Sequence, residues 1–166
     1  MTYMEKTLII IPTYNEINNI KNIVQLILDS YDNLVEILIV DDNFANRQLL
    51  LEVAEGLAVC NEVAGGKFAI NRFKEILSAQ PYDLILLNIA MPGMDGLQVL
   101  REIRAIEEKM GKKPHEQVSV VIITAYKELF VEAFRLGCLE YLMKPVDIGA
   151  LQTIIRKVEE RKSQNK

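Results

Sequence analysis

Short apolar runs alternate with amphipathic stretches along the whole of this 166-residue chain. A continuous apolar run predicts a strand that is buried on both faces, and apolar positions three and four residues apart predict a helix. The runs predict strands over residues 7–11, 35–40, 57–63, 84–87, 118–123 and 139–143. The amphipathic stretches predict helices over residues 17–28, 46–55, 68–77, 97–106, 127–136 and 151–161.

Regular alternation of strands and helices predicts an α/β fold, with a doubly wound parallel sheet covered by helices on both faces. The length suits one compact domain, and half of the residues are apolar, which is enough for a full core. Within it we expect an extra strand–helix unit over residues 1–34, a main part over 35–161 and a frayed polar tail over 162–166. Residues 107–117 are polar and predict a surface loop.

Charge and cysteine usage exclude several classes of function. The net charge of −4 does not favour nucleic acid as a partner, and no apolar run approaches the roughly 20 residues that span a membrane. Cys60 and Cys138 lie in apolar surroundings without metal-type spacing, which indicates core thiols in a reducing cytoplasm. His115 is the only histidine, so we expect no histidine-based triad or metal site.

Polar residues follow several of the predicted strands at the point where each strand ends. Ligands of parallel sheets bind outside the carboxyl ends of the strands, so the fold should bring these side chains together. The residues are Asp41, Asp42, Asn88, Thr124 and Lys144.

Each of these residues has two interpretations when it is taken alone. Adjacent carboxylates at Asp41 and Asp42 suit Mg²⁺, or they form a solvated strand end that caps the next helix. The Thr124 hydroxyl suits a hydrogen bond to a phosphoryl oxygen, or an ordinary helix cap. Lys144 suits an ion pair with a phosphate or with the two aspartates. A cis peptide bond before Pro145 would direct its side chain toward that partner.

Taken in order, these motifs resemble the receiver domains of response regulators, which are CheY-like, from about residue 35 to 161. The matching features are Asp41-Asp42, Asn88 before Met-Pro-Gly-Met-Asp-Gly, Thr124-Ala125 and Lys144-Pro145. The resemblance implies that Asp41, Asp42 and Asn88 are the metal ligands. It also implies a switch pair, Thr124 and Tyr141, and a phosphate-contacting lysine, Lys144. Tyr141 is otherwise a partly buried strand aromatic.

Asn88 departs from the family, which has an aspartate at the acceptor position. A carboxylate can attack phosphohistidine, whereas a neutral amide is not a useful nucleophile. We therefore expect no phosphotransfer, no enzyme activity and only weak Mg²⁺ binding. Three explanations stay open: a natural pseudo-receiver, an introduced Asp→Asn change, and slow deamidation of Asn88. The partners implied by the resemblance are a histidine kinase, a downstream effector protein, or another copy of the chain through its last strand and helices.

The first 43 residues carry a second resemblance, to family 2 glycosyltransferases of the dolichyl-phosphate mannosyltransferase type. It rests on residues 7–16, which end in Pro-Thr-Tyr-Asn-Glu, and on residues 36–43. It implies nucleotide-sugar contacts from Thr13, Asn15, Glu16 and Asp41. The chain lacks a later Asp-x-Asp motif in context and is too short for an acceptor-binding half, so this function is the alternative.

Residues 37–43 fit both families, which suggests a chimera, natural or engineered, and an engineered fold without a physiological role is a third hypothesis. The extra strand 7–11 needs a place in the sheet. We expect it at an edge of one six-stranded sheet or in the place of the weak strand 57–63, with a swapped dimer as the alternative.

Overall fold

The computed structural model describes residues 34–164. The predicted strand over 7–11 and helix over 17–28, and with them the extra unit, lie outside the described residues. No helix among the described residues is long and apolar enough to cross a membrane.

Five parallel strands form one sheet in the order β2-β1-β3-β4-β5. The strands are β1 (Val35–Val40), β2 (Ala58–Val63), β3 (Leu84–Leu87), β4 (Ser119–Thr124) and β5 (Glu140–Met143). β1, β3 and β4 are buried along their whole length, as their continuous apolar runs predict.

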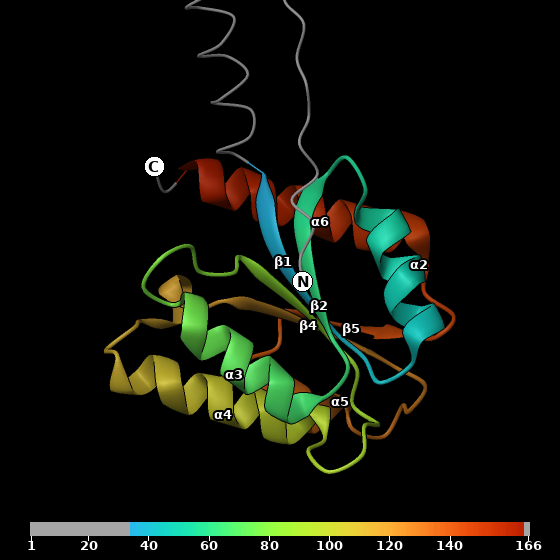
Figure 1. Ribbon diagram of the computed structural model, residues 1–166, viewed down its shortest axis with the longest axis horizontal. Helices are drawn as coiled ribbons and strands as arrows, with labels where there is room; N and C mark the ends of the chain where they lie inside the picture. The colour runs from blue at the N-terminus through green and yellow to red at the C-terminus, as the bar shows by residue number, and fades with distance from the viewer. Residues whose placement is uncertain (1–33, 165–166) are drawn as a thin grey trace, which may run out of the picture. The chain divides into compact units, whose positions relative to one another are not determined.

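Helices cover both faces of the sheet, with α2 and α6 on one side and α3 and α4 on the other (Figure 1). They are α2 (Phe44–Ala54), α3 (Gly66–Ile76), α4 (Gly96–Lys109), α5 (Phe130–Arg135) and α6 (Ile148–Gln164), with a 3₁₀ turn η1 (Pro114–Glu116). Neighbouring strand residues point to opposite faces, so Leu38 packs in one core and Ile39 in the other. The predicted doubly wound α/β fold is confirmed for the described residues.

The strand predicted over 57–63 keeps its place in the sheet. β2 pairs with β1 in continuous register from Val35 opposite Ala58 to Val40 opposite Val63. The prediction that an extra strand displaces it is therefore wrong, because the main-chain groups of β1 on that side already bond to β2. Edge addition and a swapped dimer stay predictions, since residues 7–11 lie outside the described part of the chain.

Local caps move several helix ends away from their predicted positions. α2 begins at Phe44, two residues early, because the side chain of Asn43 accepts a hydrogen bond from the main-chain N of Asn46 at 3.2 Å. α4 begins at Gly96 behind a capping box formed by Asp95 and Gln98. α5 is shorter than predicted, and it begins at Phe130 rather than Lys127.

The predicted frayed tail is wrong for residues 162–164, which continue α6. Lys162 Nζ donates to the main-chain O of Leu34 at 2.7 Å and to Asp83 Oδ2 at 2.8 Å. These bonds tie the last turn of α6 to the start of β1 and to the residue before β3. The polar side chain of Lys162 thus anchors the end of the helix.

The predicted surface loop over 107–117 is wrong over residues 107–109, which continue α4. Glu107 is fully buried, although it belongs to the last turns of α4. Its Oε1 accepts a hydrogen bond from the main-chain N of Val118 at 2.7 Å, and its Oε2 one from Arg104 Nη1 at 2.6 Å. Glu107 therefore fixes the connection from α4 to β4 from the buried side, and most of the residues after Glu107 in this connection are exposed.

Candidate functional site

The candidate site lies at the carboxyl ends of the strands, where the winding of the sheet changes direction. β1 has β2 on one side and β3 on the other, so the connections that follow β1 and β3 run to opposite sides and leave a crevice between them. Asp41 and Asp42 follow β1, Asn88 follows β3, and Lys144 follows β5. The structure brings these four side chains together, as the sequence predicts.

Asp41 is 1% exposed and is the most heavily bonded side chain of the site. Its Oδ1 accepts from the main-chain N of Asn43 at 2.8 Å, and its Oδ2 accepts from Lys144 Nζ at 2.7 Å. Asn46 Nδ2 lies 3.3 Å from Oδ1 and 3.2 Å from Oδ2. Charge-assisted bonds of this kind are strong, so both oxygens of this carboxylate are already engaged.

Asn88 is 6% exposed and links the acidic side of the site to the lysine. Its Nδ2 donates to Asp42 Oδ1 at 3.3 Å and to the main-chain O of Ala90 at 2.9 Å. Its Oδ1 accepts from Lys144 Nζ at 3.3 Å. The Lys144–Pro145 peptide bond is cis, which confirms the sequence expectation for Pro145.

Gly96 packs directly against the main chain that carries Asn88. The main-chain N of Gly96 donates to the O of Ile89 at 2.9 Å. A Cβ at Gly96 would lie 2.3 Å from the main-chain O of Asn88, which is closer than any carbon–oxygen contact allows. The first residue of α4 therefore needs to be glycine, and its close approach holds the end of β3 in place.

Thr124 and Tyr141 meet at Tyr126 rather than at the acidic pair. Thr124 is fully buried, and its Oγ1 accepts from the main-chain N of Tyr126 at 3.3 Å. The Tyr141 hydroxyl donates to the main-chain O of Tyr126. Burial raises the pKa of Tyr141, so its hydroxyl stays protonated and able to donate. Among the described residues, no hydrogen bond links Thr124 or Tyr141 to Asn88.

Sequence reasoning missed three residues of this site. Asn46 bonds to both Asp41 oxygens, and Arg47 Nη1 donates to the main-chain O of Asp41 at 3.0 Å. The signal for both was their place in the first turn of α2, directly after the acidic pair. Tyr126 joins Thr124 and Tyr141 through its main-chain atoms, which no side-chain pattern reveals.

The site as arranged does not fit a divalent cation. No group of three or more His, Cys, Asp or Glu side chains in residues 34–164 could hold a metal ion. Both oxygens of Asp41 are bonded to donors, and Asn88 turns its nitrogen rather than its oxygen toward Asp42. A hard cation needs several oxygen ligands that face it, and this arrangement presents a donor in their midst.

The two thiols and the histidine play no part in this site. Burial raises the pKa of Cys60 and of Cys138 to about 11, so both thiols stay protonated. Both cysteines are free; Cys138 is buried, as expected of a core thiol, and Cys60 is half-buried.

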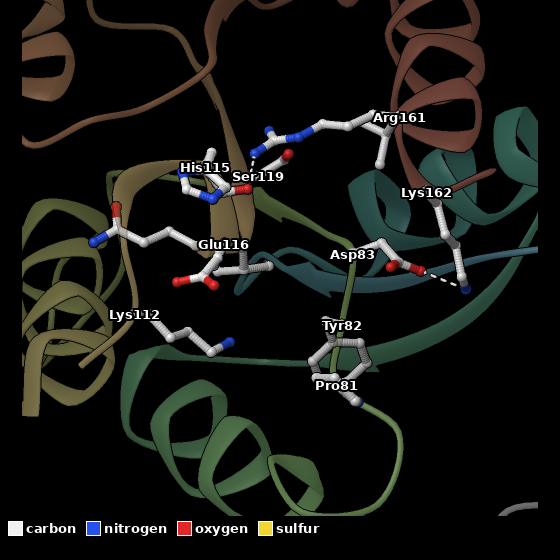
Figure 2. A pocket seen from close by; sticks show the side chains of 12 residues that line it. Pro81, Tyr82, Asp83, Lys112, His115, Glu116, Ser119, Arg161 and Lys162 are labelled. Atoms are coloured by element: carbon white, nitrogen blue, oxygen red, sulfur yellow. Dashed lines mark hydrogen bonds and ion pairs between the residues drawn. The ribbon is translucent and has the colours of Figure 1, made fainter. Parts of the chain in front are cut away.

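His115 lines a cavity of about 190 Å³ at the opposite end of the sheet. Figure 2 shows two cations of this cavity engaged with neighbours: Lys162 points to Asp83, and Arg161 reaches the main-chain O of His115. Asp83 precedes β3 and Asn88 follows it, so the length of that strand separates the cavity from the candidate site.

Comparison with protein families matches residues 37–156 to the response regulator receiver domain. The match covers more than two thirds of the chain, and it includes every residue of the site described above. The chain therefore belongs to the receiver-domain family, which acts in two-component signal transduction and phosphorelays. Its sheet order and helix arrangement are the flavodoxin-like, CheY-like fold of that family.

Two curated relatives illustrate the range of proteins to which the chain is similar. Sporulation initiation phosphotransferase F of Bacillus subtilis (strain 168) is 36% identical over 126 residues, which cover 74% of this chain and 91% of the relative. Transcriptional regulatory protein ZraR of Escherichia coli (strain K12) is 34% identical over 134 residues, which cover 77% of this chain. The chain spans only 27% of the length of ZraR.

Solved structures of receiver domains superpose on the described fold. One from Clostridium thermocellum gives a TM-score of 0.66 at 27% identity and covers 80% of this chain and 100% of its own. The receiver domain of the sensor histidine kinase PA1611 from Pseudomonas aeruginosa PAO1 was solved with a magnesium ion in its active-site cleft. It gives a TM-score of 0.63 at 28% identity and covers 76% of this chain and 98% of its own. The Saccharomyces cerevisiae Ssk1 receiver domain was solved with the histidine phosphotransfer protein Ypd1. It gives a TM-score of 0.66 at 26% identity and covers 76% of this chain and 89% of its own.

Proposed function

We propose that this chain is a receiver module that acts through protein–protein contacts and does not accept a phosphoryl group. The observation that carries the proposal is the position of Asn88, at the carboxyl end of β3 between Asp42 and Lys144. Phosphoryl acceptance at this place needs an anionic oxygen, and the lone pair of an amide is delocalised into its carbonyl. We therefore propose no enzyme activity for the chain itself.

The partners we propose are a histidine kinase or phosphotransfer protein, a downstream effector, or a second copy of the chain. The complex of the Ssk1 receiver domain with Ypd1 supports the first kind of partner. Large apolar side chains exposed on α5 and beside β5 and α6 support a protein-binding surface there. They are Phe130, Phe134, Leu139 and Ile148. We place the chain in the cytoplasm, where two-component receivers meet their kinases.

Magnesium binding is proposed to be weak. The PA1611 receiver domain supports a magnesium site in the family, but this chain has an amide in place of one carboxylate. The roles proposed for Asp41, Asp42, Thr124, Tyr141 and Lys144 are those that the sequence implies, with Lys144 as the cation nearest to the acceptor position.

The glycosyltransferase alternative and the chimera gain no support. Thr13, Asn15 and Glu16 lie outside the described residues. Asp41, the remaining residue of that hypothesis, uses its carboxylate within the receiver site. A rise in melting temperature with a UDP- or GDP-sugar would support nucleotide-sugar binding. An unchanged melting temperature would exclude this alternative.

The test of the proposed function is phosphoryl transfer from acetyl phosphate with Mg²⁺, followed by intact-mass measurement. We expect Asn88→Asp to gain one phosphoryl group and the unchanged chain to gain none, because only the variant carries a nucleophilic carboxylate. Asn61→Asp is a matched control, since it adds the same group on β2 away from the site. A phosphoryl group on the unchanged chain or on Asn61→Asp would contradict the proposal.

A further inference from the structure

We infer that the Asn88 amide takes the place of the divalent cation in this site, so that the site closes without metal. The inference rests on the proposed function in one respect, namely that Asn88 stands at the acceptor position. It goes further by assigning a structural role to the amide itself.

The nitrogen of the amide lies where two oxygens converge. Asn88 Nδ2 is 3.3 Å from Asp42 Oδ1 and 2.9 Å from the main-chain O of Ala90. An NH₂ group has two hydrogens, so both oxygens receive a bond from one atom. Carboxylate and main-chain carbonyl oxygens facing one point are also the ligands that a hard cation uses. The amide nitrogen therefore satisfies the oxygens that a cation would otherwise bridge.

The charges of the site balance with an amide and not with a carboxylate. Lys144 neutralises Asp41 at 2.7 Å, and the amide donates to Asp42 without adding a charge. An aspartate at position 88 would place three carboxylates beside one ammonium group. Like charges at such distances repel strongly when they are partly buried, and a divalent cation relieves that repulsion.

A cation can use the amide oxygen only if the amide turns over. With the amide reversed, Oδ1 would face the two oxygens of Asp42 and Ala90, and the NH₂ would face the Lys144 ammonium. Three hydrogen bonds would become three repulsive contacts, which also fixes the assignment of oxygen and nitrogen in this amide. After reversal, a bound cation would relieve the first two contacts, but the donor–donor contact with Lys144 would remain.

The surrounding main chain holds the backbone of Asn88 in place. Gly96 lies against the main-chain O of Asn88, and Asn88 N donates to the main-chain O of Val40 at 2.8 Å. The backbone at Asn88 is therefore held on both sides, and a cation can be accommodated only by rotation of the side chain. The contacts that keep a cation out are thus built into the folded chain.

The experiment compares the chain with Asn88→Asp and Asn88→Ala in thermal unfolding, with EDTA and with millimolar Mg²⁺. The melting temperature of the unchanged chain should be the same in both conditions. Asn88→Asp should melt lower in EDTA and rise with Mg²⁺, because its three carboxylates need the cation. Asn88→Ala should melt lower in both conditions, because it loses the bonds of the amide without gaining a metal ligand.

NMR on the full ¹⁵N-labelled chain gives a second readout. The Asn88 side-chain NH₂ signals, identified by their loss in Asn88→Asp, should not move with Mg²⁺. Main-chain signals around position 88 should move with Mg²⁺ in Asn88→Asp, at concentrations at least about tenfold below any that move them in the unchanged chain, since the unchanged chain lacks a charge–charge contact.

Two results would overturn the inference. One is a melting or NMR response of the unchanged chain to Mg²⁺ as large as that of Asn88→Asp. The other is the absence of a response in both proteins, because the amide would then not be what keeps the cation out. The acetyl phosphate experiment reports on the proposed function separately, so failure of either proposal can be told from failure of the other.

Discussion

Glu36 is a buried carboxyl group in the first half of β1, 9% exposed. Its Oε1 accepts from Gln80 Nε2 at 2.8 Å, and its main-chain N donates to Asp83 Oδ2 at 2.8 Å. Burial raises the pKa of Glu36 above its ordinary value of 4.5, and the nearby ammonium of Lys162 offsets this only in part. The folded chain therefore holds the Glu36 proton more tightly than the unfolded chain does.

We predict that Glu36→Gln stabilises the protein at neutral pH. Because the folded pKa is raised, stability linked to this proton is fully present below pH 4.5 and is lost as the pH rises through the folded pKa. Glutamine stays neutral and keeps an oxygen for Gln80, so it avoids that loss. Urea unfolding should show a higher midpoint for Glu36→Gln at neutral pH, and a difference that shrinks toward pH 4.5. An equal difference at both pH values, or a lower midpoint, would contradict the prediction.

At the scale of elements, one buried ion pair joins the end of α4 to the strands and loops around it. Arg104 bonds to Glu107 and also donates to the main-chain O of Val118 at 3.1 Å and of Gly137 at 2.9 Å. Glu107 bonds to the main-chain N of Val118. The pair thus links α4, the start of β4 and the turn after α5.

We predict that Glu107→Ala lowers the free energy of unfolding by about 3–5 kcal/mol, because Arg104 loses its buried partner and Val118 N its acceptor. Glu107→Gln should lose less, since its amide still accepts one bond. Glu108→Ala, on the exposed side of the same helix, is the control and should change stability by no more than about 0.5 kcal/mol. Urea denaturation followed by circular dichroism measures all three. Similar values for Glu107→Ala and Glu108→Ala would show that the pair does not hold the connection.

At the scale of the whole described domain, one sheet separates two apolar cores. The first lies under α3, α4 and α5, and the second lies under α2 and α6 (Figure 1). β1 lies inside the sheet and supplies side chains to both, with Leu38 in the first core and Ile39 in the second. Because one strand belongs to both cores, neither should melt alone.

We predict that Leu38→Ala and Ile39→Ala each lower the free energy of unfolding by about 2–5 kcal/mol and that unfolding stays a single transition. Tyr82 packs in the Leu38 core and the chain has no tryptophan, so tyrosine fluorescence reports on that side in a background whose other five tyrosines are changed to phenylalanine. Circular dichroism reports on the whole fold. Val59→Ala, at a 39% exposed position of β2, should cost much less. Separate midpoints by the two methods would indicate two independent cores.

The fold and the residues of the site could be predicted from the sequence because short segments carry the patterns that determine them. The buried strands β1 and β3 have the predicted bounds, since a continuous apolar run is stable only between two helical layers. The polar residues that end the strands of a parallel sheet converge whatever the loops do, so Asp41, Asn88 and Lys144 were placed together correctly.

The helix ends, the buried Glu107 and the bonding of Asn88 were decided by tertiary structure. The capping side chains, the hydrogen-bond partners of Glu107 and the main-chain atoms of Ala90 and Tyr126 leave no periodic pattern in a sequence. Asn88 and Lys144 are separated by 56 positions along the chain. The sequence alone determined that an amide, Asn88, follows the buried strand β3. Only the folded chain decided that its nitrogen faces Asp42, because the orientation of an amide depends on the donors and acceptors that the fold brings to it.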